Sequence, residues 1–384
     1  MISAQTLTIN NTKYDCSNAV SYHYGGFPPS SIDMGALFAP FAAALQQLTR
    51  YDEKIQNLVN SELLLAPLRR RDAVVSSRME GTISTLDAVL RLEASQAASR
   101  DDNASSESVE VLLYARALRQ AEQQMAEGYR LSEHLIRNAH RVLLSFGRGK
   151  EQSPGAYKTT QNYVGERRTK TVSFIPISPD RLSDGMGALI GFVRNSPHHP
   201  LITAAVAHAE FEALHPFEDG NGRLGRMLIP LMLWEQGVLS APHFFVSDYF
   251  DRNKNEYIER LRNVSAEAAW DAWCGFFLTA LAEQAQTNID VVAKIQALYL
   301  SMKDRFRETL RSQYYTAALD YVFANPYFWN SHFVESAAAP SSTVQNFTRR
   351  LVAEGLLRVV VPPAGRAPGL YAFPALLEII SDDG

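Results

Sequence analysis

The sequence predicts an all-α fold that carries one small β-hairpin and ends in a mixed helix and strand module. Between about residues 32 and 311, apolar side chains recur at spacings of three and four, as in Leu37, Phe41, Leu45 and Leu48. That period is typical of helices with one buried face. A stretch at 153–180 with prolines, a glycine and a short β-prone run interrupts the period, and two further β runs follow residue 315.

The expected elements follow in a simple order. We expect an irregular arm over 1–30, helices over 32–92, an exposed loop of small and polar residues over 94–107, helices over 109–127 and 133–144, the hairpin, helices over 182–286, and one long helix over 289–311. A chain of 384 residues is too long for one ordinary core. We therefore predict an N-terminal helical region (1–107), a central core (108–286), and a connecting helix with a tail module (287–384).

Composition indicates an ordinary globular protein, with 46% hydrophobic and 20% charged residues. The formal net charge of −4 gives the whole chain no general attraction for nucleic acid. Cys16 and Cys274 lie far apart, which favours two reduced thiols over a disulfide framework. The N-terminus lacks a signal-peptide pattern, and no apolar run reaches the roughly 18 residues of a membrane span. We expect a cytoplasmic protein without a membrane partner.

The most informative segment runs from His215 to Arg226 and reads HPFEDGNGRLGR. Gly220 and Gly222 permit a sharp turn and let backbone N–H groups approach a ligand closely. An apolar run at helical spacing follows the turn, so the turn lies at a helix N-terminus. Unpaired amides and the helix dipole favour phosphate at such a position.

The polar side chains of this segment suit a nucleotide polyphosphate. Arg223 and Arg226 are three residues apart, so they share one face of the first helical turn and can clamp phosphate oxygens. Asp219 offers a hard oxygen ligand for the Mg²⁺ that a nucleotide carries. His215, four residues earlier, is an imidazole and therefore a candidate general base.

This segment resembles the Fic family signature, His-x-Phe-x-Asp/Glu-Gly-Asn-Gly-Arg-x-x-Arg, at every specified position. The resemblance implies that His215 deprotonates a hydroxyl of a target protein and that Asp219 holds Mg²⁺ between the α- and β-phosphates of ATP. Arg223 would stabilise the leaving β-phosphate and Arg226 would bind the γ-phosphate, while the Gly220–Gly222 loop forms an anion hole from its amides and the Asn221 side chain. The nucleotide-binding residues implied by the match are Gly220, Asn221, Gly222, Arg223, Leu224, Gly225 and Arg226.

Two further segments extend the resemblance. Residues 154–158 and 161–165 look like the family's flap, whose backbone would pair with an extended segment of the target protein as an added strand. A plain surface hairpin is the alternative. Residues 249–254 with Tyr257 look like the segment that closes over adenine, with Asn253 and Tyr257 as candidate contacts. Ordinary helix packing is the alternative for these residues.

A second motif, Ser76-Ser77-Arg78-Met79-Glu80-Gly81, resembles the family's inhibitory signature through Ser76, Glu80 and Gly81. The resemblance implies that the Glu80 carboxylate pairs with Arg226 and takes the place of the γ-phosphate, so that ATP binds unproductively. The alternative is an exposed charge at a helix end.

The tail looks like a winged helix-turn-helix. Ser341 or Ser342 can cap a helix whose face is Val344, Phe347 and Leu351, and two β runs follow. Such modules read DNA through their second helix, where Gln345, Asn346, Arg349 and Arg350 would lie. Acidic residues also populate the tail, so protein docking or homodimer formation is the favoured use over DNA binding.

The sequence therefore predicts an AMP transferase that uses ATP and Mg²⁺, modifies a Ser, Thr or Tyr hydroxyl of a target docked at the flap, releases pyrophosphate, and is inhibited by Glu80. The alternative is a DNA-binding transcriptional regulator that uses the core as a nucleotide sensor. His215 favours the transferase, because a sensor needs no base. Transfer of another phosphate-containing group, or removal of AMP, stays open.

Overall fold

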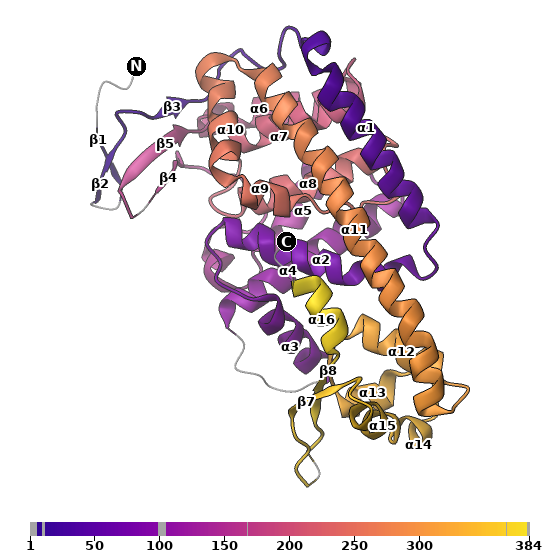
Figure 1. The fold of residues 1–384 in the computed structure, drawn as a ribbon. Coiled ribbons are helices and arrows are strands. Elements are labelled where there is room, and N and C mark those ends of the chain that lie inside the picture. Colours follow the sequence, from indigo (N-terminus) through magenta and orange to yellow (C-terminus); the bar gives the residue numbers. More distant parts are fainter. Residues whose placement is uncertain (1–5, 10–11, 99–104, 167, 366, 382–384) are drawn as a thin grey trace. The chain divides into compact units, whose positions relative to one another are not determined.

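The computed structural model describes residues 6–9, 12–98, 105–166, 168–365 and 367–381 (Figure 1). The chain forms two compact units. The first unit joins residues 1–52 to 116–285, and the second joins 53–115 to 286–384. Segments that are far apart in the sequence thus share one body. The division into 1–107, 108–286 and 287–384 stays a prediction.

The first unit is a helical body with one small sheet, as the fold class predicts. Its elements are β1 (Thr6–Ile9), β2 (Thr12–Asp15), β3 (Val20–Ser21), most of α1 (Met34–Gln56), the end of α4 (Ser106–Ala126), α5 (Glu133–Leu143), a 3₁₀ turn (Gly147–Glu151), β4 (Val164–Glu166), β5 (Thr171–Ile175), α6 (Pro179–Asn195), α7 (Pro200–Leu214), α8 (Asn221–Glu235), α9 (Ser247–Arg252), α10 (Lys254–Glu267) and the start of α11 (Trp270–Leu310). Helix α7 packs against α6, α8 and α10. It is apolar on nearly every face because neighbours cover it on several sides.

The predicted hairpin is present, with β4 antiparallel to β5. The arm over 1–30, expected to be irregular, instead supplies β1, β2 and β3, and both β2 and β3 pair in parallel with β5. Strand β5 is therefore flanked by β4 on one side and by the arm on the other. Strands of two to four residues are too short to show the alternation that identifies a strand in sequence.

The second unit combines helices from before the core with the whole tail. Its elements are α2 (Ser61–Met79), α3 (Leu86–Ala97), the start of α4 (Ser106–Ala126), the end of α11, α12 (Tyr315–Ala324), β6 (Tyr327–Trp329), α13 (Asn330–Ser336), α14 (Ser341–Val344), α15 (Phe347–Ala353), β7 (Arg358–Val361), β8 (Leu370–Ala372) and α16 (Pro374–Ser381). Helix α2 packs against α3, α12 and α16. Helix α3 packs against β6, where Trp329 Nε1 donates to Ser95 Oγ over 3.2 Å and the Tyr327 hydroxyl bonds to Asp87.

Two predicted boundaries differ from the structure, and packing explains the first. Residues 94–97, expected in a loop, continue α3, because Ser95 is buried under Trp329. Alanines such as Ala94 also have the highest intrinsic helix propensity. Residues 106–107 of that loop begin a helix at Ser106, and 99–104 lie outside the described residues. Helix α11 begins at Trp270, well before the predicted start at 289.

The tail has three short helices followed by the β7–β8 hairpin, in the order predicted for a winged helix, and β6 joins its sheet as a third strand. The predicted face of Val344, Phe347 and Leu351 is buried. Pro340 rather than a serine occupies the N-cap of α14, and no side-chain cap bond forms there. Arg350 donates to the Leu310 carbonyl over 2.7 Å, so one of the predicted DNA contacts supports packing.

No helix in the described ranges combines the length and apolarity required to cross a membrane.

Candidate active site

The segment predicted to bind nucleotide forms the junction between α7 and α8 in the first unit. His215 ends α7 and adopts a left-handed backbone conformation, with φ 46° and ψ 60°. Few residues with a side chain adopt positive φ, so neighbours must hold His215 in this state. Helix α8 begins six residues later at Asn221, directly after Gly220, which is also left-handed with φ 76°. The short junction places His215 and the N-terminus of α8 in one loop.

Asn221 closes this loop. Its side-chain oxygen accepts from the Phe217 N–H over 2.9 Å, and its Nδ2 donates to the Phe217 carbonyl over 2.8 Å. The side-chain oxygen and one of the two Nδ2 hydrogens are thereby used within the loop. Asn221 can also offer its backbone N–H to an anion, because the first N–H groups of a helix have no partner inside it. Its side-chain contact with phosphate stays a prediction.

The charged residues gather at the first turn of α8. Asp219 lies in the mouth of the loop with its side chain 44% exposed, and one of its oxygens accepts from the Gly220 N–H over 2.7 Å. Arg223 places Nη2 3.6 Å from the other oxygen. Arg223 and Arg226 are both buried, which holds two guanidinium charges at the positive end of the α8 dipole. This arrangement suits a multiply charged anion.

His140 of α5 supports the loop through its ring contacts. This residue was not predicted from the sequence. Its ring stacks on Phe217 at 3.7 Å, its Nδ1 accepts from the Gly155 N–H, and its Nε2 donates to the Asp219 carbonyl over 2.9 Å. Burial lowers the pKa of His140 to about 4, so the ring is neutral at pH 7. A buried histidine that joins two distant loops has no local sequence signature.

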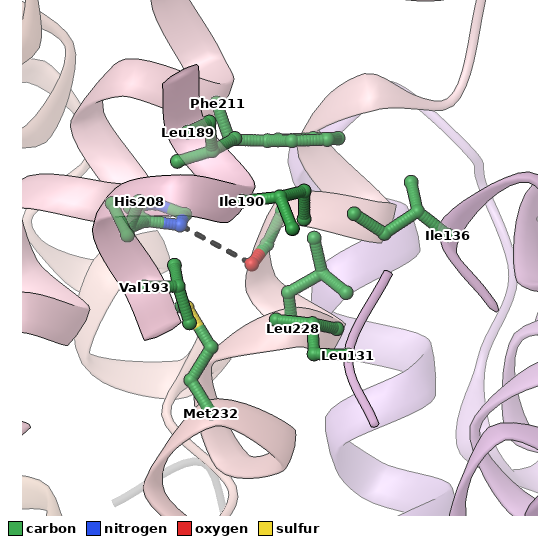
Figure 2. A pocket seen from close by; sticks show the side chains of 11 residues that line it. Leu131, Ile136, Leu189, Ile190, Val193, His208, Phe211, Leu228 and Met232 are labelled. Atoms are coloured by element: carbon green, nitrogen blue, oxygen red, sulfur yellow. Dashed lines mark hydrogen bonds between the residues drawn. The ribbon is translucent and has the colours of Figure 1, made fainter. Parts of the chain in front are cut away.

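His208 of α7 contacts the start of α8. Its Nδ1 donates to the Gly225 carbonyl over 3.2 Å, as Figure 2 shows, and its Nε2 accepts from the Tyr257 hydroxyl over 2.8 Å. A small cavity of about 10 Å³ lies beside the ring, lined by apolar side chains such as Leu189 and Leu228. Tyr257 is 4% exposed and packs on Phe250, as the alternative of helix packing requires, and its contact with adenine stays a prediction.

Buried His208 predicts that acid destabilises the fold. Burial, reinforced by Arg226, lowers its pKa to about 3, whereas an unfolded histidine titrates near 6.5. Between those values the unfolded chain binds a proton that the folded chain excludes, so the free energy of unfolding falls as pH drops below 6.5. One proton contributes roughly 1.4 kcal/mol per pH unit. Thermal denaturation between pH 7.5 and 5 measures this slope.

His208→Gln keeps a donor and an acceptor but cannot titrate, and we expect it to reduce the pH slope by about one proton. His134→Ala, at an exposed position of α5, serves as the control and should leave the slope unchanged. Equal slopes for wild type and His208→Gln would contradict the assignment.

The remaining predicted residues lie apart from the loop in the sequence. Asn253 joins α9 to α10, and its Nδ2 donates to the Tyr249 carbonyl over 3.0 Å. Its contact with adenine stays a prediction. Ser76, Glu80 and Gly81 belong to the second unit, where Ser76 is fully buried and Glu80 is the exposed C-cap of α2.

The end of α2 is a Schellman motif. Gly81 has φ 84°, its N–H donates to the Arg78 carbonyl, and the Thr82 N–H donates to the Ser77 carbonyl. Only glycine adopts this φ without strain, so Gly81 ends the helix immediately after Glu80. The Thr82 hydroxyl also donates to Glu110 over 3.3 Å. The position of Glu80 on its own unit is therefore well defined.

Comparison with known protein families gives two matches. Residues 130–233 match the Fic/DOC family, and residues 39–123 match the Fic/DOC family N-terminal region. The first range includes the whole loop from His215 to Arg226, and the second includes the helix that ends at Glu80.

The chain is also similar in sequence to curated proteins. The chain is 30% identical over 114 residues to a protein adenylyltransferase of Caenorhabditis briggsae, which is 29% of this chain and 21% of that protein. The chain thus spans about a fifth of that relative. It is also 31% identical over 111 residues to a Fido domain-containing protein of Dictyostelium discoideum, which is 29% of this chain and 71% of that protein.

A solved structure shares the fold. The crystal structure of a Fic family protein from Desulfovibrio desulfuricans superposes with a TM-score of 0.57 at 22% identity, covering 90% of this chain and 98% of that one. At this identity the likeness concerns the fold alone.

Proposed function

Since this chain belongs to the Fic/DOC family, we propose that it is a protein adenylyltransferase that moves AMP from ATP to a Ser, Thr or Tyr hydroxyl of a target protein. The observation that carries the proposal is the α7–α8 junction. There the imidazole of His215, at the end of α7, lies in the same short loop as the N-terminal amides of α8.

In the proposed reaction the target hydroxyl oxygen attacks the α-phosphorus of ATP, the bond to the bridging oxygen of the β-phosphate breaks, and pyrophosphate leaves. His215 takes the hydroxyl proton. Its Nδ1 lies 3.4 Å from the Glu212 carbonyl, and donation to that oxygen leaves Nε2 with the lone pair that a base needs. The buried guanidiniums of Arg223 and Arg226 and the first amides of α8 offset the charge of the phosphates.

Asp219 fits the role of magnesium ligand. Its carboxylate is partly exposed at the loop mouth, and the oxygen that faces Arg223 keeps a lone pair available in a contact as long as 3.6 Å. Bound Mg²⁺ would neutralise part of the phosphate charge. The amides of the loop and the two arginines would offset the remaining phosphate charge and orient the phosphates.

We place the target on the outer edge of β4. Among the described strands β4 pairs only with β5, so its other edge can receive an extended segment as an added strand. Strand β4 begins at Val164, shortly after residues whose side chains contact the His215 loop. A target strand on this edge would bring its hydroxyl near the base.

Labelled ATP tests the function. We expect label in the α-phosphate to enter protein in a lysate, or the enzyme itself, and label in the γ-phosphate to leave as pyrophosphate. Mass spectrometry then identifies the hydroxyl that carries AMP. Protein-bound label from the γ-phosphate would indicate a kinase, and label from neither position would exclude the transferase.

A further inference from the structure

The left-handed His215 requires external support, and two side chains at the base of the flap supply it. Lys158 and Asn162 lie between the turn at Gly155 and strand β4. Lys158 is 3% exposed although it is a lysine. A lysine is rarely buried unless its donors are used.

These two residues bind four successive carbonyl oxygens. The Lys158 Nζ donates to Leu214 over 3.0 Å and its backbone N–H donates to Pro216 over 2.9 Å. The Asn162 Nδ2 donates to His215 over 3.0 Å and to Phe217 over 2.9 Å. Every carbonyl from 214 to 217 therefore has a donor from outside the α7–α8 junction.

The two side chains also fix each other. The Lys158 Nζ donates to Asn162 Oδ1 over 2.7 Å, so the amide oxygen faces the lysine and the NH₂ group faces the loop. Both hydrogens of that NH₂ group are then committed to His215 and Phe217. Each side chain makes at least two hydrogen bonds, so neither can rotate without breaking them.

We propose that Lys158 and Asn162 are positioning residues that hold the His215 backbone left-handed and thereby aim its imidazole at the target hydroxyl. This inference rests on the proposed function for its kinetic consequence but on the backbone geometry for its structural one. Neither side chain acts on substrate. The flap would therefore have two roles. Lys158 and Asn162 position His215, and the edge of β4 binds the target.

Kinetics separate positioning from general damage. Asn162→Asp keeps size and shape but removes both donors, and Lys158→Met keeps the chain length without a donor. We expect kcat for AMP transfer to fall about 100-fold in each, because a misplacement near 1 Å costs that much. The KM and Kd for ATP should stay within about twofold, since the α8 amides and arginines are untouched.

Matched controls lie elsewhere in the first unit. Asn195→Asp removes an exposed donor to the Gly191 carbonyl on α6, and Lys150→Met changes an exposed lysine. Both should retain wild-type kcat. Wild-type kcat in Asn162→Asp and Lys158→Met, or a parallel loss of kcat and ATP affinity, would overturn the positioning role.

A second measurement needs no activity. The His215 ring signal, assigned by its absence in His215→Ala, should move in NMR spectra of Asn162→Asp and Lys158→Met but not in those of the controls. An unchanged ring signal would overturn the inference even if the wild type transferred no AMP. Absence of transfer by the wild type, with a shifted ring signal, would instead refute only the proposed function.

Discussion

His215→Ala should lower AMP transfer by about a thousandfold while ATP still binds. Loss of a positioned general base typically costs 10²–10⁴-fold in rate. The ring is removed from the end of α7, whereas the amides of α8, Asp219 and the two arginines remain in place. The variant should therefore bind ATP with an affinity close to that of wild type, as calorimetry would measure.

His134→Ala is the matched control, because it removes an exposed histidine from α5. It should transfer AMP at the wild-type rate. Undiminished incorporation by His215→Ala would remove His215 from the mechanism. A loss of ATP affinity equal to the loss of rate would instead mean that the substitution disturbs the phosphate loop.

Glu80→Gly should raise AMP transfer about thirtyfold, and Arg226 should be needed for the gain. We propose that the Glu80 carboxylate pairs with the guanidinium of Arg226, which the γ-phosphate requires, and that it repels the arriving phosphate. At an effective dielectric near 20, one like-charge contact at ~4 Å costs about 4 kcal/mol. Even half of that energy, about 2 kcal/mol, changes the population of productively bound ATP about thirtyfold.

Glu127→Gly offers a closely matched control. Glu127 is an exposed acid at the end of α4 and precedes Gly128 with φ 98°, just as Glu80 ends α2 before Gly81 with φ 84°. AMP incorporation is compared in wild type, Glu80→Gly, Glu127→Gly and Glu80→Gly with Arg226→Ala at matched Mg²⁺ over a range of ATP concentrations. A rate for Glu80→Gly no higher than wild type would end the self-inhibition model and leave the transferase proposal standing.

The sequence was most informative where chemistry is local. The stretch His215–Arg226 predicts its own loop and helix start, because glycines, an apolar period and charged residues lie within a few positions. The mainly helical fold and the flap hairpin were predicted correctly for the same reason: each depends on short-range periodicity and turn residues.

The rest depends on contacts between distant residues. Leu45 belongs to the predicted apolar stripe of α1 yet is 38% exposed, whereas Tyr51 is buried and bonds to the His243 carbonyl. His140 and the arm strands β2 and β3 gain their roles from partners more than 70 residues away, such as Asp219 and β5. The side chain of Asn221 faces its own loop, which the motif alone does not reveal.

The shared body of α2, α3 and the tail restricts how this protein can evolve by recombination. A tail exchanged from another gene would have to present a hydroxyl to Asp87, an indole to Ser95 and an aromatic ring to Arg91, whose guanidinium lies 5.0 Å from the Tyr327 ring. These residues precede the core in the chain, whereas their counterparts follow it. Crossovers on both sides of the core would be needed together, so the two ends of the second unit should be inherited as a pair.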